Sequence, residues 1–481
     1  MKKVLKRVMS ALLCATMLAG AMSLCACEKK ADAETLVWYM PADANQPGKD
    51  AVVEEINKIT QEKIGVNIDL RFIDESSYNQ RLEMMLASGE EMDLCFIGYL
   101  YTLQNAIRKE ALTDITEYVK NLEVYDTIDE DIWKSCTYEG KLYAVPNIQI
   151  MSMGTAAVFR KDMVDKYGLD LDSVNSYNDL IPFFEKIRDN EPDLIPERAG
   201  ACFAGEFDKT RTYDVFYDLV RYNPENDKVE VSDEMPGRYN RAVLCHEFYQ
   251  KGFVRKDAAT VTDDTADLNA GRYVQTNDAS KPGDAEERTR MTGHEYVSKE
   301  VIPGIMCYNT ATATMLGVPL QSKNPEKAVE FINLLHTDKD LYNLVVFGVE
   351  GVNYKKISDE RVEKIENSGY DMKAQGWKFG NQFNQYLTPE LPDGIWEKTK
   401  EINDNAERSE ILGFFLDDSM ITTEISQCTK VRQEYSKRIS AGVEDPAEYY
   451  DEYLDKLKKA GVYTIRDEVQ RQIDEFKKNN N

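Results

Sequence analysis

Aromatic side chains gather near the ends of the predicted strands in the first hundred residues. They are Trp38, Tyr39, Tyr78, Tyr99 and Tyr101. A single aromatic residue at a strand end usually packs beneath a loop, but several at one edge of a sheet favour contact with a ligand. A flat aromatic ring can stack on the apolar C–H face of a pyranose, while amides and carboxylates pair with its hydroxyls. If the ligand is a saccharide, we expect it to bind at this edge.

Motifs of the common hydrolases and nucleotide-binding proteins do not occur in the sequence. The histidines are His246, His294 and His336, and none lies in an HExxH motif, so a zinc protease is not supported. The sequence has no GxxxxGKS/T, GxGxxG or GxSxG motif, which argues against nucleotide use and against an α/β-hydrolase. A glycoside hydrolase needs two carboxylates about 5–10 Å apart. With 85 acidic residues such a pair can arise by chance, so this alternative stays open.

The aromatic residues are positioned by an alternation of strand and helix patterns. Residues 35–40 and 93–98 are short apolar runs typical of buried strands, and residues 66–72 alternate apolar with polar side chains. Between them, residues 50–64 and 82–86 carry apolar residues at helical spacing. The resulting β-α-β-α-β order predicts parallel strands joined by right-handed crossovers. In such sheets ligands bind beyond the carboxyl ends of the strands.

Length and composition describe a folded protein of more than one domain. The chain has 481 residues, of which 42% are hydrophobic, and its 59 basic and 85 acidic residues give a formal charge of −26. This size corresponds to two or three domains or to one large two-lobed body. Because a polyanion would meet a repulsive field, we expect no binding to nucleic acid.

The start of the chain has the pattern of an export signal. Residues 1–7 hold four basic side chains, residues 8–24 are almost wholly apolar or small, and the LCAC tetrapeptide at residues 24–27 resembles a bacterial lipobox. We therefore expect residues 1–26 to be cleaved and Cys27 to carry a lipid. That lipid would anchor the protein to the outer face of the cytoplasmic membrane. A cleaved signal without lipid and an uncleaved membrane anchor are the alternatives.

Six cysteines remain beyond the predicted lipidation site. They are scattered, without a CxxC pair or a regular spacing, so we predict neither a zinc site nor a redox motif and expect no metal or cofactor. Buried free thiols are the expectation, although an exported chain could also pair them. The six are Cys95, Cys136, Cys202, Cys245, Cys307 and Cys428.

Short motifs along most of the chain resemble a known family of transport receptors. The first are LASGE at residues 86–90, YEGKLYAVP at 138–146, FRKD at 159–162 and KYGL at 166–169. In this order and behind a lipobox, they resemble the extracellular solute-binding proteins of ABC importers. Three later motifs are similar to the lipoprotein subgroup found near carbohydrate-uptake genes in low-GC Gram-positive bacteria. They are NPEKA at 324–328, FGVEGVNY at 347–354 and GWKFGNQF at 376–383.

The resemblance implies an α/β protein with the two-lobed type II fold of periplasmic binding proteins. Each lobe would be a mixed, mostly parallel sheet flanked by helices, with an extra helical region at the C-terminus. The implied function is capture of a small solute, above all an oligosaccharide, between lobes that close on it, and its delivery to ABC permease subunits. Such a receptor would be a monomer and not an enzyme. A peptide-binding receptor, a secreted glycoside hydrolase and a surface adhesin are the alternatives.

By analogy with that family, the chain is expected to cross between the lobes more than once. The expected segments are a linker at 27–34, the first part of lobe 1 at 35–148, the first part of lobe 2 at 149–264, a return to lobe 1 at 265–315, and the rest of lobe 2 with a helical extension at 316–481.

In the helical extension, three tyrosines have helical spacing, so we expect them in a core rather than in a platform that binds sugar. They are Tyr449, Tyr450 and Tyr453.

The expected ligand contacts come from several segments. Asp278 is included because the resemblance places its strand-to-loop junction at the cleft between the lobes. For Trp377 and Asn381, a packed corner between a lobe and the C-terminal tail is the alternative. The expected stacking residues are Trp38, Tyr99, Tyr101 and Trp377, the expected hydrogen-bonding residues are Gln149, Asp208 and Asn381, and Tyr39 and Asp278 are further expected contacts.

Overall fold

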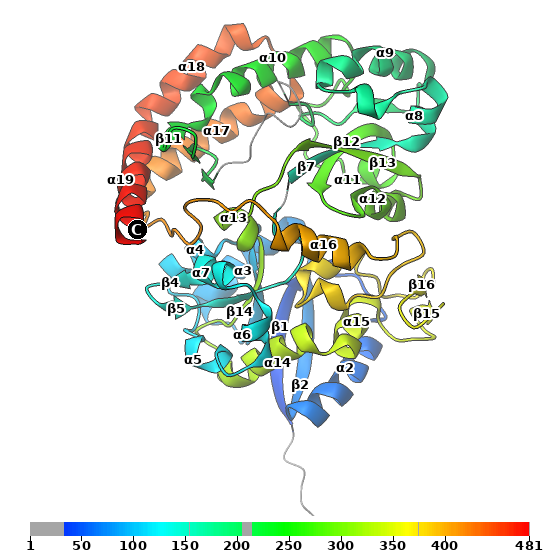
Figure 1. Cartoon of the computed structure of the whole chain (residues 1–481), viewed down its shortest axis with the longest axis vertical. Helices are drawn as coiled ribbons and strands as arrows, with labels where there is room; N and C mark the ends of the chain where they lie inside the picture. Colours follow the sequence, from blue (N-terminus) through cyan, green and yellow to red (C-terminus); the bar gives the residue numbers. More distant parts are fainter. Residues whose placement is uncertain (1–32, 153, 204–213, 374, 481) are drawn as a thin grey trace, which may run out of the picture.

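The chain folds into two lobes, one above the other along the long axis of the molecule (Figure 1). The computed structural model describes residues 33–152, 154–203, 214–373 and 375–480. Each lobe is built around its own β-sheet with helices packed against it. The two-lobed α/β architecture predicted from the sequence is therefore confirmed.

The first lobe contains a five-stranded sheet in the order β2-β1-β3-β14-β6. β1 pairs in parallel with β2 and β3, whereas β14 runs antiparallel to β3 and β6. Helices α2 (Lys49–Lys63) and α3 (Glu75–Ser88) connect the parallel strands, so the predicted β-α-β-α-β order is correct. The strands are β1 (Glu34–Pro41), β2 (Val66–Ile73), β3 (Leu94–Gly98), β6 (Ala144–Pro146) and β14 (Thr314–Gly317).

Residues that follow β14 also belong to the first lobe. α14 (Pro325–Thr337) and α15 (Lys339–Phe347) share one hydrophobic core with β1, β2 and β3. The expectation that residues 316–481 continue the second lobe is wrong for these helices, because the apolar face of α14 completes the first core.

The remaining elements outside the second lobe are α4 (Leu103–Arg108), α5 (Thr116–Val119), α6 (Glu123–Thr127), α7 (Glu130–Cys136), β4 (Thr137–Tyr138), β5 (Lys141–Leu142), α13 (Tyr308–Ala311), β15 (Tyr354–Lys356), β16 (Val362–Lys364), η4 (Gly376–Lys378), η5 (Gln382–Asn384) and α16 (Ile395–Asp404).

The second lobe contains a four-stranded sheet in the order β13-β7-β12-β8. β7 lies between β12 and β13 and runs antiparallel to both, while β12 pairs in parallel with β8. The expected return of residues 265–315 to the first lobe is thus wrong for β12 and β13. These strands supply the hydrogen-bonding partners on both sides of the largely buried strand β7. The strands are β7 (Gly154–Arg160), β8 (Ile195–Glu197), β12 (Tyr273–Ser280) and β13 (Tyr296–Ile302).

Helices and a small second sheet complete the second lobe, which is the upper lobe in Figure 1. The small sheet has the strand order β11-β10-β9 and is antiparallel. Its strands are β9 (Val215–Phe216), β10 (Val220–Asn223) and β11 (Lys228–Val231). The helices up to residue 292 are α8 (Lys161–Tyr167), η1 (Leu171–Ser173), η2 (Tyr177–Leu180), α9 (Ile181–Asn190), η3 (Ser232–Glu234), α10 (Pro236–Gln250), α11 (Thr265–Asn269) and α12 (Asp284–Thr292).

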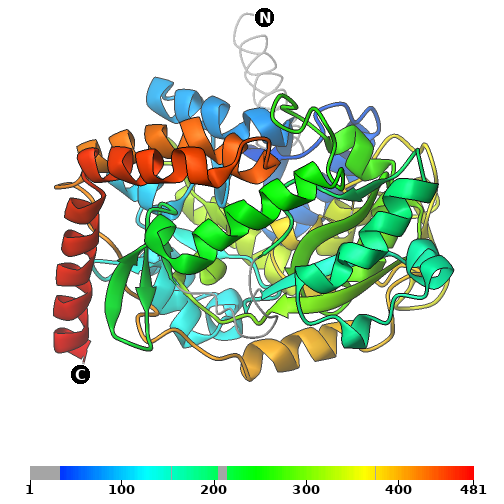
Figure 2. The ribbon, with the colours of Figure 1, turned by 90° about the horizontal axis from the view of Figure 1, so that it is seen from above.

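The last three helices pack with the β11-β10-β9 sheet around a separate hydrophobic core. Tyr449, Tyr450 and Tyr453 are buried in it, so their predicted core role is confirmed. The Asp445 side chain caps the middle helix by accepting a hydrogen bond from the Ala447 N–H. In the view from above, the last helix lies at one end of the molecule (Figure 2). The three are α17 (Thr422–Ala441), α18 (Pro446–Lys459) and α19 (Val462–Asn480).

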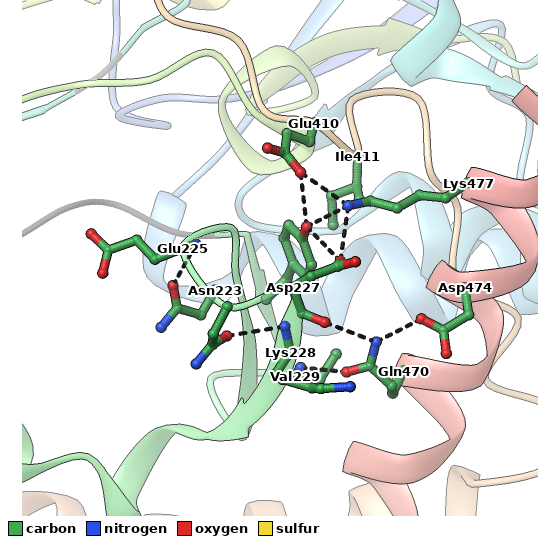
Figure 3. Close-up of polar contacts among 12 residues, drawn as sticks. Asn223, Glu225, Asp227, Lys228, Val229, Glu410, Ile411, Gln470, Asp474 and Lys477 are labelled. Atoms are coloured by element: carbon green, nitrogen blue, oxygen red, sulfur yellow. Dashed lines mark hydrogen bonds and ion pairs between the residues drawn. The ribbon is translucent and has the colours of Figure 1, made fainter. Parts of the chain in front are cut away.

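One lysine ties α19 to the rest of the upper lobe (Figure 3). Lys477 Nζ lies 2.9 Å from an oxygen of Asp227 and 2.9 Å from an oxygen of Glu410, and it also donates to the Tyr222 hydroxyl. Closer to the start of α19, Gln470 accepts a hydrogen bond of 2.7 Å from the backbone of β11. The C-terminal helix is therefore fastened both to the small sheet and to the segment that precedes α17.

Three segments of the described chain cross between the lobes, and hydrogen bonds link them. They lie between β6 and β7, between β13 and β14, and between α16 and α17. Asn403, at the end of α16, donates to the Gln149 carbonyl (2.6 Å) and accepts from the Met151 N–H (2.7 Å) in the first crossing. In the second crossing, the Met306 N–H donates to the Glu407 carbonyl of the third (2.8 Å). Few, linked crossings of this kind can act as a hinge.

Glu197, the last residue of β8, carries a buried carboxyl group in the second lobe. It is 1% exposed, and neither carboxyl oxygen has a hydrogen-bond partner among the described residues. Burial raises the pKa of this group well above its usual range. The folded protein therefore holds the proton more tightly than the unfolded chain. Stability is lost as the pH rises from about 4.3 towards the folded pKa.

We expect Glu197→Gln to remove this pH-dependent loss. Relative to the wild type, the variant's free energy of unfolding should increase between about pH 4.5 and 7.5, by at most about 1.4 kcal/mol per pH unit. Urea denaturation at both pH values measures the difference. Glu191→Gln is the control, because the hydrogen bond from Lys166 lowers the pKa of Glu191 and gives no such gain. A Glu197→Gln difference that is equal at both pH values would contradict the expectation.

Candidate ligand-binding site

The carboxyl ends of β3 and β6 point towards the second lobe. β6 leads directly into the first crossing, and the N–H of Tyr99, just after β3, donates to the Ala313 carbonyl in the second crossing (2.9 Å). Gly98 has φ +149°, and a Cβ atom there would lie 2.1 Å from the same carbonyl oxygen, so only glycine allows β3 to end here. This is the edge at which the sequence predicts ligand binding.

Two aromatic side chains lie together at this edge. Tyr99 is 46% exposed, and the centroid of its ring is 5.9 Å from that of Trp377, with 51° between the ring planes. Trp377 is half-buried in η4. Phe96 packs edge-on against Tyr99 from the core side, at 5.7 Å between centroids. The pair joins two predicted stacking residues that are 278 positions apart in the sequence.

A buried lysine and a glutamate support the aromatic pair. Lys378 is fully buried, and its Nζ donates to Glu75 (2.8 Å), to the Pro41 carbonyl (3.1 Å) and to Gln375 (3.0 Å). The other oxygen of Glu75 accepts a hydrogen bond of 2.5 Å from the Tyr99 hydroxyl. Burial lowers the pKa of Lys378. For Glu75, burial acts in the opposite direction, but the charge and hydrogen bond of Lys378 prevail and lower its pKa.

We expect Lys378→Met to destabilise this edge of the first lobe. Removing one partner of a buried ion pair leaves the other uncompensated, and because Glu75 is 41% exposed the cost should be about 1–3 kcal/mol of unfolding free energy. Lys373→Met is the matched control, since Lys373 and Asp43 form an exposed pair (3.2 Å) worth at most about 1 kcal/mol. Urea denaturation compares the two variants. Equal losses of unfolding free energy would show that the buried Lys378–Glu75 pair stabilises the protein no more than the exposed Lys373–Asp43 pair does.

Three of the predicted ligand contacts lie in the first core instead. Trp38 is 0% exposed and packs edge-to-face with Phe331 and Phe379, at 5.2 and 5.8 Å between centroids. Tyr39 is buried, and Tyr101 is buried as well. β1 is covered on both faces, so neighbouring side chains on opposite sides of the strand are both enclosed. The prediction that these residues contact a ligand is wrong for this arrangement of the chain.

Gln149 and Asn381 support the crossings. Gln149 is buried and its side-chain amide donates to the Thr314 hydroxyl (2.9 Å), which joins the first crossing to β14. The Asn381 side chain accepts a hydrogen bond of 3.0 Å from the Phe383 N–H. The hydrogen bond of Asn381 is thus a local one at the start of η5, whereas Trp377 lies beside the exposed Tyr99.

Asp278, at the far end of β12, already has a charged partner. Its carboxylate accepts from Arg288 Nε (2.9 Å) and from Nη2 (2.5 Å), and its side chain is 28% exposed. Burial raises the pKa of Asp278, although the charge of Arg288 acts against it. Asp208 and Cys27 lie outside the described residues.

Two cavities of ligand size lie away from the aromatic pair. One of about 360 Å³ opens in the second lobe and is lined by residues that include Asn277 and the Arg198–Asp264 ion pair, whose two contacts are 2.8 Å each. The other, of about 800 Å³, is lined by residues of α7, the third crossing and α19. Both volumes are typical of small-molecule sites. Neither cavity is lined by Tyr99 or Trp377.

Glu75 and Lys378 are the site residues that sequence reasoning missed. They are 303 positions apart, and no local pattern connects them. In the part of the chain that the structure describes, no group of three or more His, Cys, Asp or Glu residues is arranged to hold a metal ion. Among the same residues, no helix has the length and apolar composition that a membrane span requires.

Comparison with known proteins gives the family. Residues 43–340 match the bacterial extracellular solute-binding protein family, and residues 410–478 match a domain of unknown function, DUF3502. A carbohydrate ABC transporter substrate-binding protein of Streptococcus pneumoniae serotype 4 (strain ATCC BAA-334 / TIGR4) is 29% identical over 440 residues, which cover 89% of this chain and 88% of that protein.

Solved structures share the fold. The N-glycan transport solute binding protein NgtS from Streptococcus pneumoniae has a TM-score of 0.81 at 28% identity, covering 93% of this chain and all of that one. An extracellular solute-binding protein from Bifidobacterium longum subsp. infantis, at 15% identity, has a TM-score of 0.59 over 92% of this chain and 98% of its own. The fold is thus the type II fold of solute-binding proteins. Since the family match spans more than half of the sequence, the chain belongs to the bacterial extracellular solute-binding proteins.

Proposed function

We propose that this chain is the substrate-binding receptor of a carbohydrate ABC importer. It captures an oligosaccharide between its two lobes, does not alter it chemically, and delivers it to permease subunits in the membrane. The observation that carries the proposal is the Tyr99–Trp377 pair, which lies on the strand edge that faces the second lobe. Exposed aromatic faces suit the apolar side of a sugar ring. Family membership supports the transport role.

The ligand class follows from the relatives. NgtS from Streptococcus pneumoniae has been solved in complex with Man1GlcNAc and with Man5GlcNAc. The curated Streptococcus pneumoniae relative is named a carbohydrate ABC transporter substrate-binding protein. We therefore propose an oligosaccharide of mannose and N-acetylglucosamine as the first ligand to test, ahead of peptides.

A thermal-shift screen tests the function. The mature protein is heated with Man1GlcNAc, Man5GlcNAc, unrelated oligosaccharides and a peptide library, and a bound ligand should raise the Tm in proportion to ln(1 + [L]/Kd). We expect shifts with oligosaccharides only, and recovery of each glycan with its mass unchanged. Shifts with peptides alone would favour a peptide receptor, and shortened glycans would favour a hydrolase. No shift in either library would favour an adhesin.

The proposal includes a lipid anchor at Cys27, on the outer face of the cytoplasmic membrane, and a monomeric receptor. The lipobox-like tetrapeptide at residues 24–27 supports the anchor. Cys27→Ser should move the protein from the membrane fraction to the medium when the full-length chain is produced in a Gram-positive host. Membrane association that persists in the variant would contradict lipidation at this residue.

A further inference from the structure

Two cysteines of the second lobe lie in direct contact. The Sγ atoms of Cys202 and Cys245 are 3.3 Å apart, and both side chains are buried. Other thiols meet backbone groups instead: Cys95 donates to the Gly317 carbonyl and Cys428 donates to the Leu457 carbonyl, each at 3.8 Å. The contact between Cys202 and Cys245 therefore brings together two groups that can react with each other.

The backbone around the two thiols is already held in place. Cys202 follows β8, Cys245 lies in α10, and both belong to the same hydrophobic core. Arg241, one turn before Cys245, donates from Nε to the Cys202 carbonyl at 2.9 Å. A disulfide needs a sulfur–sulfur distance of about 2.05 Å. The sulfur atoms must therefore approach by about 1.3 Å before a bond can form.

We propose that Cys202 and Cys245 form an intramolecular disulfide when the protein meets an oxidant of the disulfide class, such as oxidised glutathione. The two thiols lose two protons and two electrons, and a bond forms between their sulfur atoms. The electrons reduce the sulfur–sulfur bond of the oxidant, which leaves as two thiols. An exported protein meets such oxidants outside the cytoplasm.

One thiol of the pair reacts first, as its thiolate. The hydrogen bond between the two thiols lowers the pKa of the Cys245 thiol, burial acts against this, and the charge of Arg241 lowers the pKa further. The thiolate attacks the oxidant and forms a mixed disulfide, and the other thiol of the pair, as its thiolate, then attacks the protein sulfur of that mixed disulfide and displaces the second thiol of the oxidant. Both steps take place when the buried pair opens locally.

The bond would close a loop that contains the small sheet of the upper lobe. The two cysteines are 43 positions apart, and β9, β10 and β11 lie between them. A cross-link over this length restricts the unfolded chain and so favours the folded one. It would join the segment that follows β8, the edge strand of the four-stranded sheet, to α10.

The test uses the mature full chain in its folded state. Reduced protein is incubated for a day with oxidised glutathione, in a low concentration of urea that leaves the protein folded. The thiols that remain free are then alkylated, and the protein is digested and analysed by mass spectrometry. We expect the loss of two thiols per chain, a peptide that links Cys202 to Cys245, and a Tm several degrees higher that dithiothreitol reverses. The other four thiols should stay free during the incubation and be recovered as alkylated cysteines: Cys95, Cys136, Cys307 and Cys428.

Variants separate this pair from other reactions of the protein. Cys245→Ala should abolish the rise in Tm caused by oxidised glutathione, and Cys136→Ala should keep it. Six thiols that remain free, a glutathione adduct without a linked peptide, or a different pair of linked cysteines would each overturn the proposal. Since the linked peptide is sought in the wild-type chain, the test stands even where a variant folds poorly.

Discussion

Trp377→Ala should weaken oligosaccharide binding by about ten- to a hundredfold, a loss of about 1.4–2.8 kcal/mol. The ring of Trp377 lies beside the exposed Tyr99 at the edge that faces the second lobe. Its removal takes away a stacking surface for the sugar. Because Trp377 is half-buried, the free energy of unfolding should change much less than it does for a core tryptophan. Titration calorimetry with Man5GlcNAc, or with the best ligand of the screen, measures the affinity.

Trp396→Ala is the matched control for this prediction. Trp396 donates from its indole N–H to the Gln385 carbonyl (2.8 Å) and packs near Phe383, with 6.5 Å between ring centroids. It belongs to the support of a loop rather than to the aromatic pair, so its loss should leave the affinity within about twofold. An unchanged affinity in Trp377→Ala, or equal losses in the two variants, would show that the site is misplaced.

Trp38→Ala should lower the free energy of unfolding by about 3–5 kcal/mol. The side chain is 0% exposed and contacts Phe331 of α14 and Phe379 near η4, so its removal leaves a cavity where β1 meets two segments of the first lobe. Urea denaturation measures the loss as a lower midpoint, with the slope of the transition unchanged if unfolding remains two-state.

Trp38→Phe is the informative partner of that variant. The indole N–H of Trp38 has no hydrogen-bond partner among the described residues, so phenylalanine gives up volume but no hydrogen bond. It should cost clearly less stability than alanine. A stable Trp38→Ala protein that no longer binds oligosaccharide would contradict the core role and would restore Trp38 as a ligand contact.

The order of elements in the first lobe could be predicted because its signals are local. The apolar run of β1, the alternation in β2 and the helical spacing of α2 each lie within about fifteen residues, and together they indicate parallel strands. The carboxyl edge of the sheet, and Tyr99 at it, follow from that order. The same apolar run also indicates a strand that is covered on both faces, and this accounts for the burial of Trp38 and Tyr39.

The assignment of later segments to lobes could not be read from local pattern. The local sequence of β12 and β13 does not indicate which strand each one pairs with. Both pair with β7, and the paired residues are more than a hundred positions apart in the sequence. α14 has a clear apolar face, but the sequence does not state which core that face completes. The position of a helix or strand in the sequence is thus easier to predict than the strand or core against which it packs.

The candidate site was predicted in part for the same reason. Tyr99 follows a strand and Trp377 lies in a recognisable motif, so both could be selected singly. The Glu75–Lys378 pair and the contact between Cys202 and Cys245 depend on side chains that meet only in the folded chain. Charged residues make up 30% of the sequence and its cysteines are scattered, so no single group stands out before folding brings it to its partner.

The measurement that tests capture between the lobes most directly is small-angle X-ray scattering during titration with oligosaccharide. We predict that the radius of gyration of the mature protein falls and reaches a plateau at one Man5GlcNAc, or one best ligand, per chain. Trp377→Ala should need a higher ligand concentration for the same change. A glycan that binds with one-to-one stoichiometry while the scattering profile stays unchanged would contradict the account.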